Sequence, residues 1–353
     1  MRIVVMPGDG IGPEITRATC AALVALDGKL GLGLELDEQP MGLATLETEG
    51  SSLPPRVLEA ARAAPGVILA PVHTYAYPPA AAGGINPSAA IRIALDLYAN
   101  IRPSRTRTGV SSPAKEMDLV VVRENTEGFY ADRNMAVGSG EFQPTEDVAL
   151  AVRKITAPAC RRIARAAFEQ AARRRGKVTM VHKANVLKIS DGLFKREVEA
   201  VAKDYPGIAL DEMLVDAMAA RLVRAPDDFD VVVTTNMYGD ILSDEAAELA
   251  GGLGLAPALN AGDEHAIAQA VHGSAPDIAG QGVANPTALM LSAAMLLDWL
   301  GARHGRDDLA RGAALLMRAV DDALADAKNH TRDLGGNAGT DGFAAAVVAA
   351  IGA

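Results

Sequence analysis

The sequence has few cysteines, few aromatic residues and no excess of positive charge. Its two cysteines, Cys20 and Cys160, lie far apart without a CxxC partner, so neither a disulfide framework nor a cysteine zinc site is predicted. This usage favours a reducing, cytoplasmic compartment. Asp plus Glu number 44 against 34 Lys plus Arg, and the net charge of -10 repels nucleic-acid phosphates. Nucleic acid is therefore not expected as a partner.

Long hydrophobic runs are also missing. Met1 leads directly into a strand-like segment, which leaves no room for a secretion signal. The most apolar late stretch, Pro286 to Leu300, is shorter than the roughly 20 residues that a membrane helix needs. We therefore expect a soluble protein without a membrane anchor. The 353 residues suffice for about two domains, and aromatics at 4% imply a core of small and aliphatic side chains.

Short β-branched runs alternate with longer helical patterns along the chain. The strand-like runs are residues 3–6, 66–70, 119–122, 178–181 and 229–235, and helical patterns follow at 15–26 and 240–250. This alternation predicts an α/β fold with a largely parallel sheet. From Pro286 onward the sequence is typical of helices separated by polar breaks. Residues 130–145 are polar and glycine-bearing without helical period, which suits an arm or clasp and a surface loop equally well.

A glycine-rich turn follows the first strand, at Gly8-Asp9-Gly10-Ile11-Gly12-Pro13. It lacks the third glycine of GxGxxG, so a Rossmann-type phosphate turn is poorly supported. A tight turn with proline at the start of a helix accounts for it equally well.

Acidic side chains mark a possible metal site. Asp240 and Asp244 lie four apart on one helical face after a strand, and such hard oxygen donors suit Mg²⁺ or Mn²⁺. A solvated helix face is the alternative. Asp216 lies in an apolar run, where an unpaired carboxylate is costly, and this favours a bound cation.

Three arginines, Arg92, Arg102 and Arg123, stand near the ends of expected elements. Their fork-shaped guanidinium groups can bind carboxylates bidentately, although surface ion pairing explains each one taken singly. Lys183 directly follows a strand, where ligands bind in α/β folds, and Tyr130 closes a polar segment. Either can serve as an acid or base, or lie on an ordinary surface or interface.

The segment from His272 to Pro286 is rich in small residues and turn formers. Its backbone can approach a ligand closely. Asp277 can accept hydrogen bonds from ribose hydroxyls and would repel a 2′-phosphate, which favours NAD over NADP.

Six distinctive blocks occur in order along the chain. The blocks are GDGIGPE at 8–14, LDLYANIRP at 95–103, VRENTEG at 122–128, HKANVLKISDGLF at 182–194, TTNMYGDILSD at 234–244 and HGSAPDIAGQGVANPTA at 272–288. Together they resemble the β-decarboxylating dehydrogenases, the family of isocitrate, homoisocitrate and 3-isopropylmalate dehydrogenases. The resemblance extends from Arg2 to about Phe343.

The resemblance implies a two-domain α/β fold of isocitrate/isopropylmalate dehydrogenase type, not a Rossmann fold, with the active site in the interdomain cleft. Residues 1–98 and 251–353 would form a large cofactor-binding domain. Residues 99–250 would form a small dimerisation domain with a clasp around 130–146. The family implies a homodimer with shared active sites, with tetramers also possible, and the partner subunit would supply Lys183 and Asp216.

The resemblance also assigns roles to residues. It implies Tyr130 and Lys183 as the acid/base pair, NAD as cofactor and Mg²⁺ or Mn²⁺ as the metal. The lysine would take the proton of the substrate hydroxyl, and the tyrosine would protonate C3 after loss of CO₂. The implied substrate-binding residues are Arg92, Arg102, Arg123, Asn86, Ser88 and Asn185. The implied metal ligands are Asp216, Asp240 and Asp244. The implied cofactor-binding residues are Ile11, His272, Gly273, Ser274, Ala275, Asp277, Ile278 and Asn285.

The resemblance implies a 2-hydroxy di- or tricarboxylate as the substrate class. In the segment before Arg92, Asn86 and Ser88 stand in reversed order relative to the isocitrate type, and the leucine pair of the isopropylmalate type is replaced by Ser88 and Ala89. The segments at 124–127 and 182–185 resemble the isocitrate and homoisocitrate forms more than the isopropylmalate form. We therefore favour isocitrate or homoisocitrate, with 3-isopropylmalate, tartrate or D-malate as alternatives. A regulatory subunit without catalysis is a further alternative. It predicts that some of the catalytic, substrate-binding or metal-binding residues are missing.

Overall fold

The chain divides into two compact units in this computed structural model, which describes residues 1–130, 135 and 137–353. Unit 1 comprises Met1–Leu95, Arg107–Pro113 and Gly251–Ala353, and unit 2 comprises Asp96–Thr106 and Ala114–Ala250. Residues 107–113, which fall inside the expected middle domain by sequence, are thus grouped with unit 1. The cofactor-binding and dimerisation roles of the two domains stay predictions.

Unit 1 contains strands in the order β2-β1-β3-β12-β11. The first four are parallel neighbours, and only β11 runs antiparallel, to β12. The strand bounds are β1 Arg2–Met6, β2 Glu35–Glu38, β3 Gly66–Leu69, β11 Leu259–Ala261 and β12 Ala266–Ala268. Strands β1 and β3 are buried almost throughout, as their unbroken apolar runs predict for parallel strands covered on both faces.

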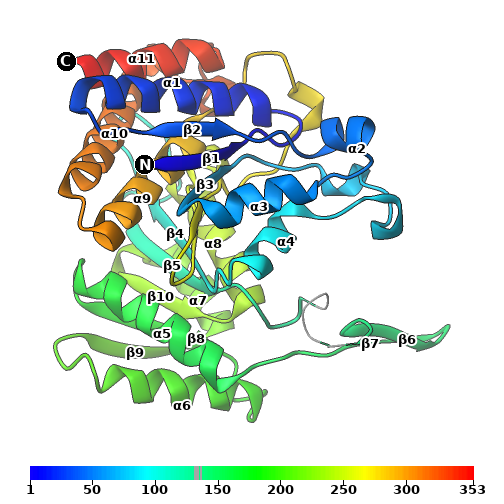
Figure 1. The fold of residues 1–353 in the computed structure, drawn as a ribbon. Coiled ribbons are helices and arrows are strands. Elements are labelled where there is room, and N and C mark those ends of the chain that lie inside the picture. Colours follow the sequence, from blue (N-terminus) through cyan, green and yellow to red (C-terminus); the bar gives the residue numbers. More distant parts are fainter. Residues whose placement is uncertain (131–134, 136) are drawn as a thin grey trace. The chain divides into compact units, whose positions relative to one another are not determined.

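Helices cover these strands. The bounds are α1 Gly12–Leu30, α2 Leu43–Glu49, α3 Pro55–Ala63, α4 Pro87–Ala94, α9 Thr287–His304, α10 Asp307–Ala325 and α11 Thr340–Gly352. Helix α9 packs against β3 and β12 and buries residues on every side, whereas α1 lies alongside α11 (Figure 1). No helix in the described part of the chain is long and apolar enough to cross a membrane.

Unit 2 contains strands in the order β4-β5-β10-β8-β9. Strand β4 pairs antiparallel with β5, and the others are parallel. The bounds are β4 Ala99–Arg105, β5 Asp118–Glu124, β8 Lys177–His182, β9 Ala209–Leu214 and β10 Val231–Thr234.

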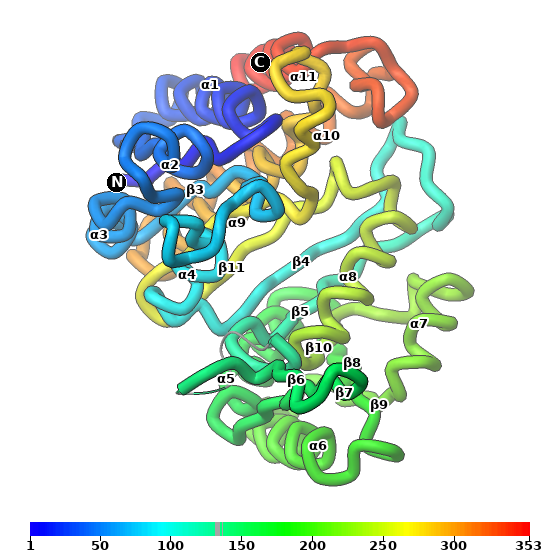
Figure 2. Tube along the Cα trace, turned by 90° about the vertical axis from the view of Figure 1, so that its right-hand side faces the viewer, coloured from blue at the N-terminus to red at the C-terminus, as the bar shows by residue number. Residues whose placement is uncertain are grey.

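Helices α5 (Ala157–Ala172) and α6 (Ser190–Ala202) lie side by side, and so do α7 (Val215–Arg224) and α8 (Asn236–Ala250) (Figure 2). Because side chains alternate along a strand, Leu119 and Val121 of β5 share one face. They belong to an apolar core that includes Met218 of α7 and Leu242 of α8. Helix α8 is thereby fixed directly after β10, and its first turns carry the candidate metal ligands.

A two-stranded hairpin, β6 (Glu141–Thr145) and β7 (Val148–Ala151), projects from the rest of unit 2 (Figure 1). All nine of its strand residues are exposed. The expected clasp at 130–146 falls partly on residues 131–134 and 136, which lie outside the described residues. Its clasp role stays a prediction.

The predicted α/β fold with a largely parallel sheet is confirmed. The strand expected at 229–235 is shorter, because Phe229 follows a short helical turn and α8 begins at Asn236. Strands β2, β4, β9, β11 and β12 were not expected from the sequence. Strand β4 contains Pro103 and two arginines, so it shows no alternating apolar pattern.

Candidate active site

Five of the candidate residues meet in unit 2 around Asp240. Arg123 at the end of β5 forms an ion pair with Asp240, and the Tyr130 hydroxyl donates to Asp240 Oδ2 at 2.6 Å. Arg102 Nη1, from β4, lies 3.2 Å from Oδ1 of both Asp240 and Asp244. The convergence of Arg102 and Arg123 on these carboxylates, which the sequence could not establish, is therefore present.

Neighbours on α8 hold both guanidinium groups in place. Asn236 Oδ1 accepts hydrogen bonds from Arg123 Nε and Nη2 at 2.9 and 2.7 Å, and Ser243 Oγ accepts from Arg102 Nη1 at 2.8 Å. At Gly239 a Cβ would lie 2.7 Å from the Arg123 side chain, so only glycine allows the helix to approach β5 this closely. The arginines are therefore buried and oriented before any ligand arrives.

Burial shapes the electrostatics of this cluster. Burial, followed by repulsion from Arg123, lowers the pKa of Arg102 to about 10, although Asp240 and Asp244 oppose the shift. Burial also raises the pKa of Asp244, with Arg102 opposing the shift. The pKa of Tyr130 is raised mainly by burial, so its hydroxyl carries a proton at neutral pH. A protonated phenol is the form that a general acid requires.

The catalytic candidate Lys183 and the metal-ligand candidate Asp216 form a separate pair in unit 2. Lys183 follows β8, and its Nζ donates to Oδ1 of Asp216 in the first turn of α7 at 2.5 Å. This hydrogen bond lowers the pKa of the exposed Asp216 carboxyl. Across the described residues, no group of three or more His, Cys, Asp or Glu side chains could hold a metal ion, so Asp216 does not join Asp240 and Asp244 within one chain.

The carboxylates of α8 fit a hard divalent cation. Mg²⁺ in proteins is commonly held by one or two carboxylates, with substrate and water oxygens as its remaining ligands. Asp240 and Asp244 supply such a pair from one helical face, and both are partly open, with side-chain exposures of 37% and 50%. The donor chemistry thus matches the implied Mg²⁺ or Mn²⁺.

The substrate-binding candidates of unit 1 lie on α4. Ser88 and Arg92 are four residues apart, and both hydrogen-bond to Gln269: Arg92 Nη2 donates to Gln269 Oε1 at 2.8 Å, and Gln269 Nε2 donates to Ser88 Oγ at 3.1 Å. Asn86 caps the helix, since its side chain accepts from the Ala89 amide. In unit 2, Asn185 is exposed in the turn after Lys183.

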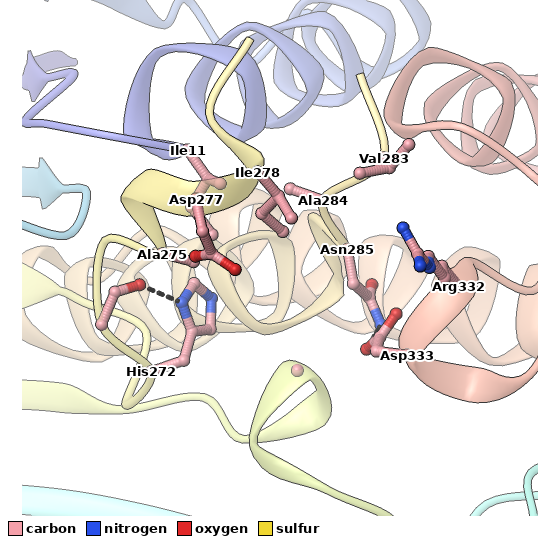
Figure 3. A pocket seen from close by; sticks show the side chains of 12 residues that line it. Ile11, His272, Ala275, Asp277, Ile278, Val283, Ala284, Asn285, Arg332 and Asp333 are labelled. Atoms are coloured by element: carbon pink, nitrogen blue, oxygen red, sulfur yellow. Dashed lines mark hydrogen bonds between the residues drawn. The ribbon is translucent and has the colours of Figure 1, made fainter. Parts of the chain in front are cut away.

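A cavity of about 640 Å³ lies in unit 1 (Figure 3). Seven of the eight cofactor-binding candidates line it, namely Ile11, His272, Gly273, Ala275, Asp277, Ile278 and Asn285. Of its other lining residues, Val283 and Ala284 lie in the segment 272–286 that the sequence indicated, whereas Gly254, Arg332 and Asp333 were not expected. Arg332 and Asp333 come from a short helical turn near the C-terminus, and no local pattern connected that turn with the loop at 272–286.

Ser274, the eighth candidate, is buried and is not among the residues that line the cavity. Its carbonyl accepts from the Ile11 amide at 2.8 Å, and its hydroxyl is 3.3 Å from His73 Nδ1. The next residue, Ala275, has a φ of +37°, a backbone conformation that residues other than glycine rarely adopt. The loop is thus held in a strained conformation by contacts behind it.

The cavity chemistry fits a dinucleotide. The carbonyl of Gly273 can only accept, so the contact of 3.0 Å with His272 Nδ1 places a proton on that nitrogen. Nε2 is buried and has no hydrogen-bond partner among the described residues, which suits a ligand donor group. Burial lowers the pKa of His272 and favours the neutral ring. Asn285 and Arg332 lie on the opposite side of the cavity from His272 and Asp277 (Figure 3).

A buried carboxyl group in unit 2, that of Glu127, predicts a pH-dependent stability. Burial, with a contribution from Glu124, raises the pKa of Glu127 to about 6 although Thr156 donates to it. Because the folded state holds this proton more tightly than the unfolded chain, stability falls as pH rises through the window from about 4.5 to 6. We expect Glu127→Gln to raise the free energy of unfolding by about 1–2 kcal/mol at pH 8. At pH 4 it should change little.

Urea denaturation at both pH values measures this effect. Glu47→Gln, at an exposed position of α2, is the matched control and should change neither value. An equal effect of Glu127→Gln at pH 4 and pH 8 would contradict the assignment to this carboxyl.

A family model described as isocitrate/isopropylmalate dehydrogenase matches residues 2–347. The chain belongs to this family. It is 44% identical over 352 residues to the isocitrate/homoisocitrate dehydrogenase of Thermus thermophilus, covering 99% of this chain and 98% of that one. It is 41% identical over 346 residues to the 3-isopropylmalate/3-methylmalate dehydrogenase of Methanocaldococcus jannaschii, covering 96% and 95%.

A solved structure supports the same family assignment. The isocitrate dehydrogenase from Methylococcus capsulatus matches with a TM-score of 0.87 and 39% identity over 99% of both chains. The protein is therefore a dehydrogenase of a family that catalyses oxidative decarboxylation of hydroxy acids and generally uses NAD(P) with Mg²⁺ or Mn²⁺. The predicted family is confirmed.

Proposed function

We propose that the protein catalyses the NAD⁺-dependent oxidative decarboxylation of a 3-substituted (R)-malate, with isocitrate or homoisocitrate as the favoured substrate, to a 2-oxo acid, CO₂ and NADH. The polar face of α4 carries this proposal. Ser88 and Arg92 share Gln269, so the surface beside Arg92 is a hydrogen-bonding one. A carboxylate-bearing substituent can accept further hydrogen bonds from such a surface, whereas an isopropyl group can form none with it.

The side chains have distinct tasks in the proposed reaction. Arg92, Arg102 and Arg123 bind substrate carboxylates, and the exposed Asn185 contacts the substrate. Asp240 and Asp244, with Asp216 of a second copy, hold Mg²⁺ or Mn²⁺. The bound ion supplies a positive charge that favours ionisation of the hydroxyl and stabilises negative charge after loss of CO₂.

Proton transfers belong to two residues. Lys183 of a second copy would accept the proton of the C2 hydroxyl, and bound NAD⁺ would supply the hydride acceptor for C2. Tyr130, kept protonated by burial, donates a proton to C3 after CO₂ has left. All these residues are present, which disfavours a regulatory subunit without catalysis.

A second candidate substrate is 3-isopropylmalate. Ala89 and Ile93 lie four apart on α4, and Ile93 is 52% exposed, so an apolar strip runs beside the polar one. The relative from Methanocaldococcus jannaschii carries that substrate in its name.

A substrate panel tests the proposal. We expect metal-dependent NADH formation, measured by absorbance, with isocitrate or homoisocitrate, and much weaker rates with 3-isopropylmalate, D-malate and tartrate. A chelator should stop turnover. A higher kcat/KM for 3-isopropylmalate than for isocitrate and homoisocitrate would contradict the proposed substrate. No NADH formation with any of these acids would favour the regulatory-subunit alternative.

Cofactor preference gives a further prediction. Asp277 is exposed at the cavity edge, where its charge would repel a 2′-phosphate. We expect Asp277→Lys to raise the KM for NAD⁺ about tenfold and to improve the use of NADP⁺, because one repulsive charge becomes attractive. Initial rates with both cofactors measure this change.

Asp322→Lys, on the exposed side of α10, makes the same charge change and should leave both KM values unaltered. An unchanged preference in Asp277→Lys would mean that this loop does not read the ribose.

A further inference from the structure

Asp9, in the turn after β1, joins two other segments of unit 1 through its side chain, which accepts three hydrogen bonds from them. Its Oδ1 accepts from the Leu43 amide at 2.7 Å, and its Oδ2 accepts from the His73 amide at 2.8 Å and from the Tyr77 hydroxyl at 2.5 Å. The Asp9 side chain is buried, with an exposure of 5%. Three hydrogen bonds compensate for the burial of this carboxylate, and they fix the segments around it.

Tyr77 and His73 bracket a single helical turn, Thr74–Ala76. Because both residues donate to the same oxygen of Asp9, the turn is fastened at its two ends. Its middle residue, Tyr75, is 99% exposed. Burial, with the hydrogen bond to Asp9, raises the pKa of Tyr77, so the phenol stays a donor throughout the working pH range.

The turn Thr74–Ala76 is linked, through the neighbouring His73, to the loop that lines the dinucleotide cavity. His73 Nδ1 lies 3.3 Å from Ser274 Oγ, and the Ser274 carbonyl accepts from the Ile11 amide. At Gly10 a Cβ would lie 2.0 Å from that same carbonyl, so the backbone segments of Gly10 and Ser274 are in close contact. Ile11 and Ala275 line the cavity, and Ala275 holds the strained backbone described above.

We propose that Tyr77 is a positioning residue for the dinucleotide pocket: its hydrogen bond to Asp9 fixes the turn Thr74–Ala76, and this turn holds the Ser274-Ala275 backbone in its binding conformation through His73. The inference rests on the proposed use of a dinucleotide. Tyr77 touches no cavity-lining atom in this scheme and acts only through Asp9 and His73.

Tyr77→Phe, which removes one hydroxyl and keeps the ring, tests the proposal. We expect the dissociation constant for NADH, from fluorescence titration, to rise about fivefold, because one hydrogen bond to a charged group is lost and the loop must be ordered on binding. The kcat at saturating substrate and cofactor should stay within about twofold, because no group at the reacting atoms changes. Tyr75→Phe removes a hydroxyl two residues away at an exposed position and should change neither value.

Amide hydrogen exchange of the protein without cofactor gives an independent readout. The His73 amide should exchange faster in Tyr77→Phe than in the wild type or Tyr75→Phe. In an Asp9→Asn background, Tyr77→Phe should add less to the dissociation constant than it does alone, because the two side chains act as one unit.

Two results would overturn the proposal: an unchanged NADH dissociation constant in Tyr77→Phe, or unchanged exchange of the His73 amide. Failure of the wild type to bind NADH would instead overturn the proposed function, and the exchange experiment would still decide whether Tyr77 fixes the turn.

Discussion

Lys183→Met should reduce kcat by about 10²–10⁴-fold while leaving NADH binding intact. The side chain lies directly after β8, and its amine is held at 2.5 Å from Asp216 Oδ1. Methionine has a similar length and no basic nitrogen, so the proton of the substrate hydroxyl loses its acceptor. The cavity of unit 1, which lies on other segments of the chain, is untouched.

Single-turnover and steady-state rates, with NADH titration by fluorescence, measure the two halves of this prediction. Lys203→Met, at an exposed position after α6, removes an amine without any expected loss of rate. The melting temperature should change little, because exposed ion pairs contribute at most about 1 kcal/mol. Turnover equal to that of the wild type would remove Lys183 from the mechanism.

Asp240→Asn should lower kcat/KM by at least about 100-fold and raise the metal concentration needed for half-maximal rate. The Asp240 carboxylate is the centre of the unit 2 cluster, where it pairs with Arg123 and accepts from Tyr130 at 2.6 Å. The amide keeps the shape and removes the negative charge. The variant therefore binds a divalent cation less tightly, and Arg102 and Arg123 lose a charge that offsets their mutual repulsion.

Titration of the rate with Mg²⁺ and Mn²⁺ separates these two effects. Excess metal should restore part of the rate if the loss lies in metal binding, and the remainder reports substrate binding and proton transfer. Asp227→Asn, in the exposed turn before β10, is the control with the same chemical change. A normal metal requirement in Asp240→Asn would contradict its role as a ligand.

The sequence motifs predicted the members of the unit 2 cluster but not their contacts. Asp240 and Asp244 follow β10 on one helical face, as their spacing indicates. Arg102 and Arg123 meet them because β4 and β5 are antiparallel neighbours, and β4 was not recognised as a strand. Its proline and arginines carry no alternating apolar pattern, so tertiary pairing decides this strand.

Long-range polar contacts could not be predicted from the sequence for a different reason. Gln269 lies 177 residues from Arg92, and Tyr77 lies 68 residues from Asp9. A glutamine or tyrosine in a loop has many possible partners, and only the folded chain selects one. The cavity shows the opposite case, because most of its wall comes from one contiguous motif whose small residues indicated close approach of a ligand.

The separation of Lys183 and Asp216 from Asp240 and Asp244 within one chain has a genetic consequence. If each site combines residues of two copies, a dimer of one Lys183→Met chain and one Asp240→Asn chain carries one site with both lesions and one site with neither. Two inactive proteins, unfolded and refolded together, should then regain about a quarter of wild-type activity, because half of the dimers are mixed. Such complementation would let two defective alleles support growth where neither does so alone.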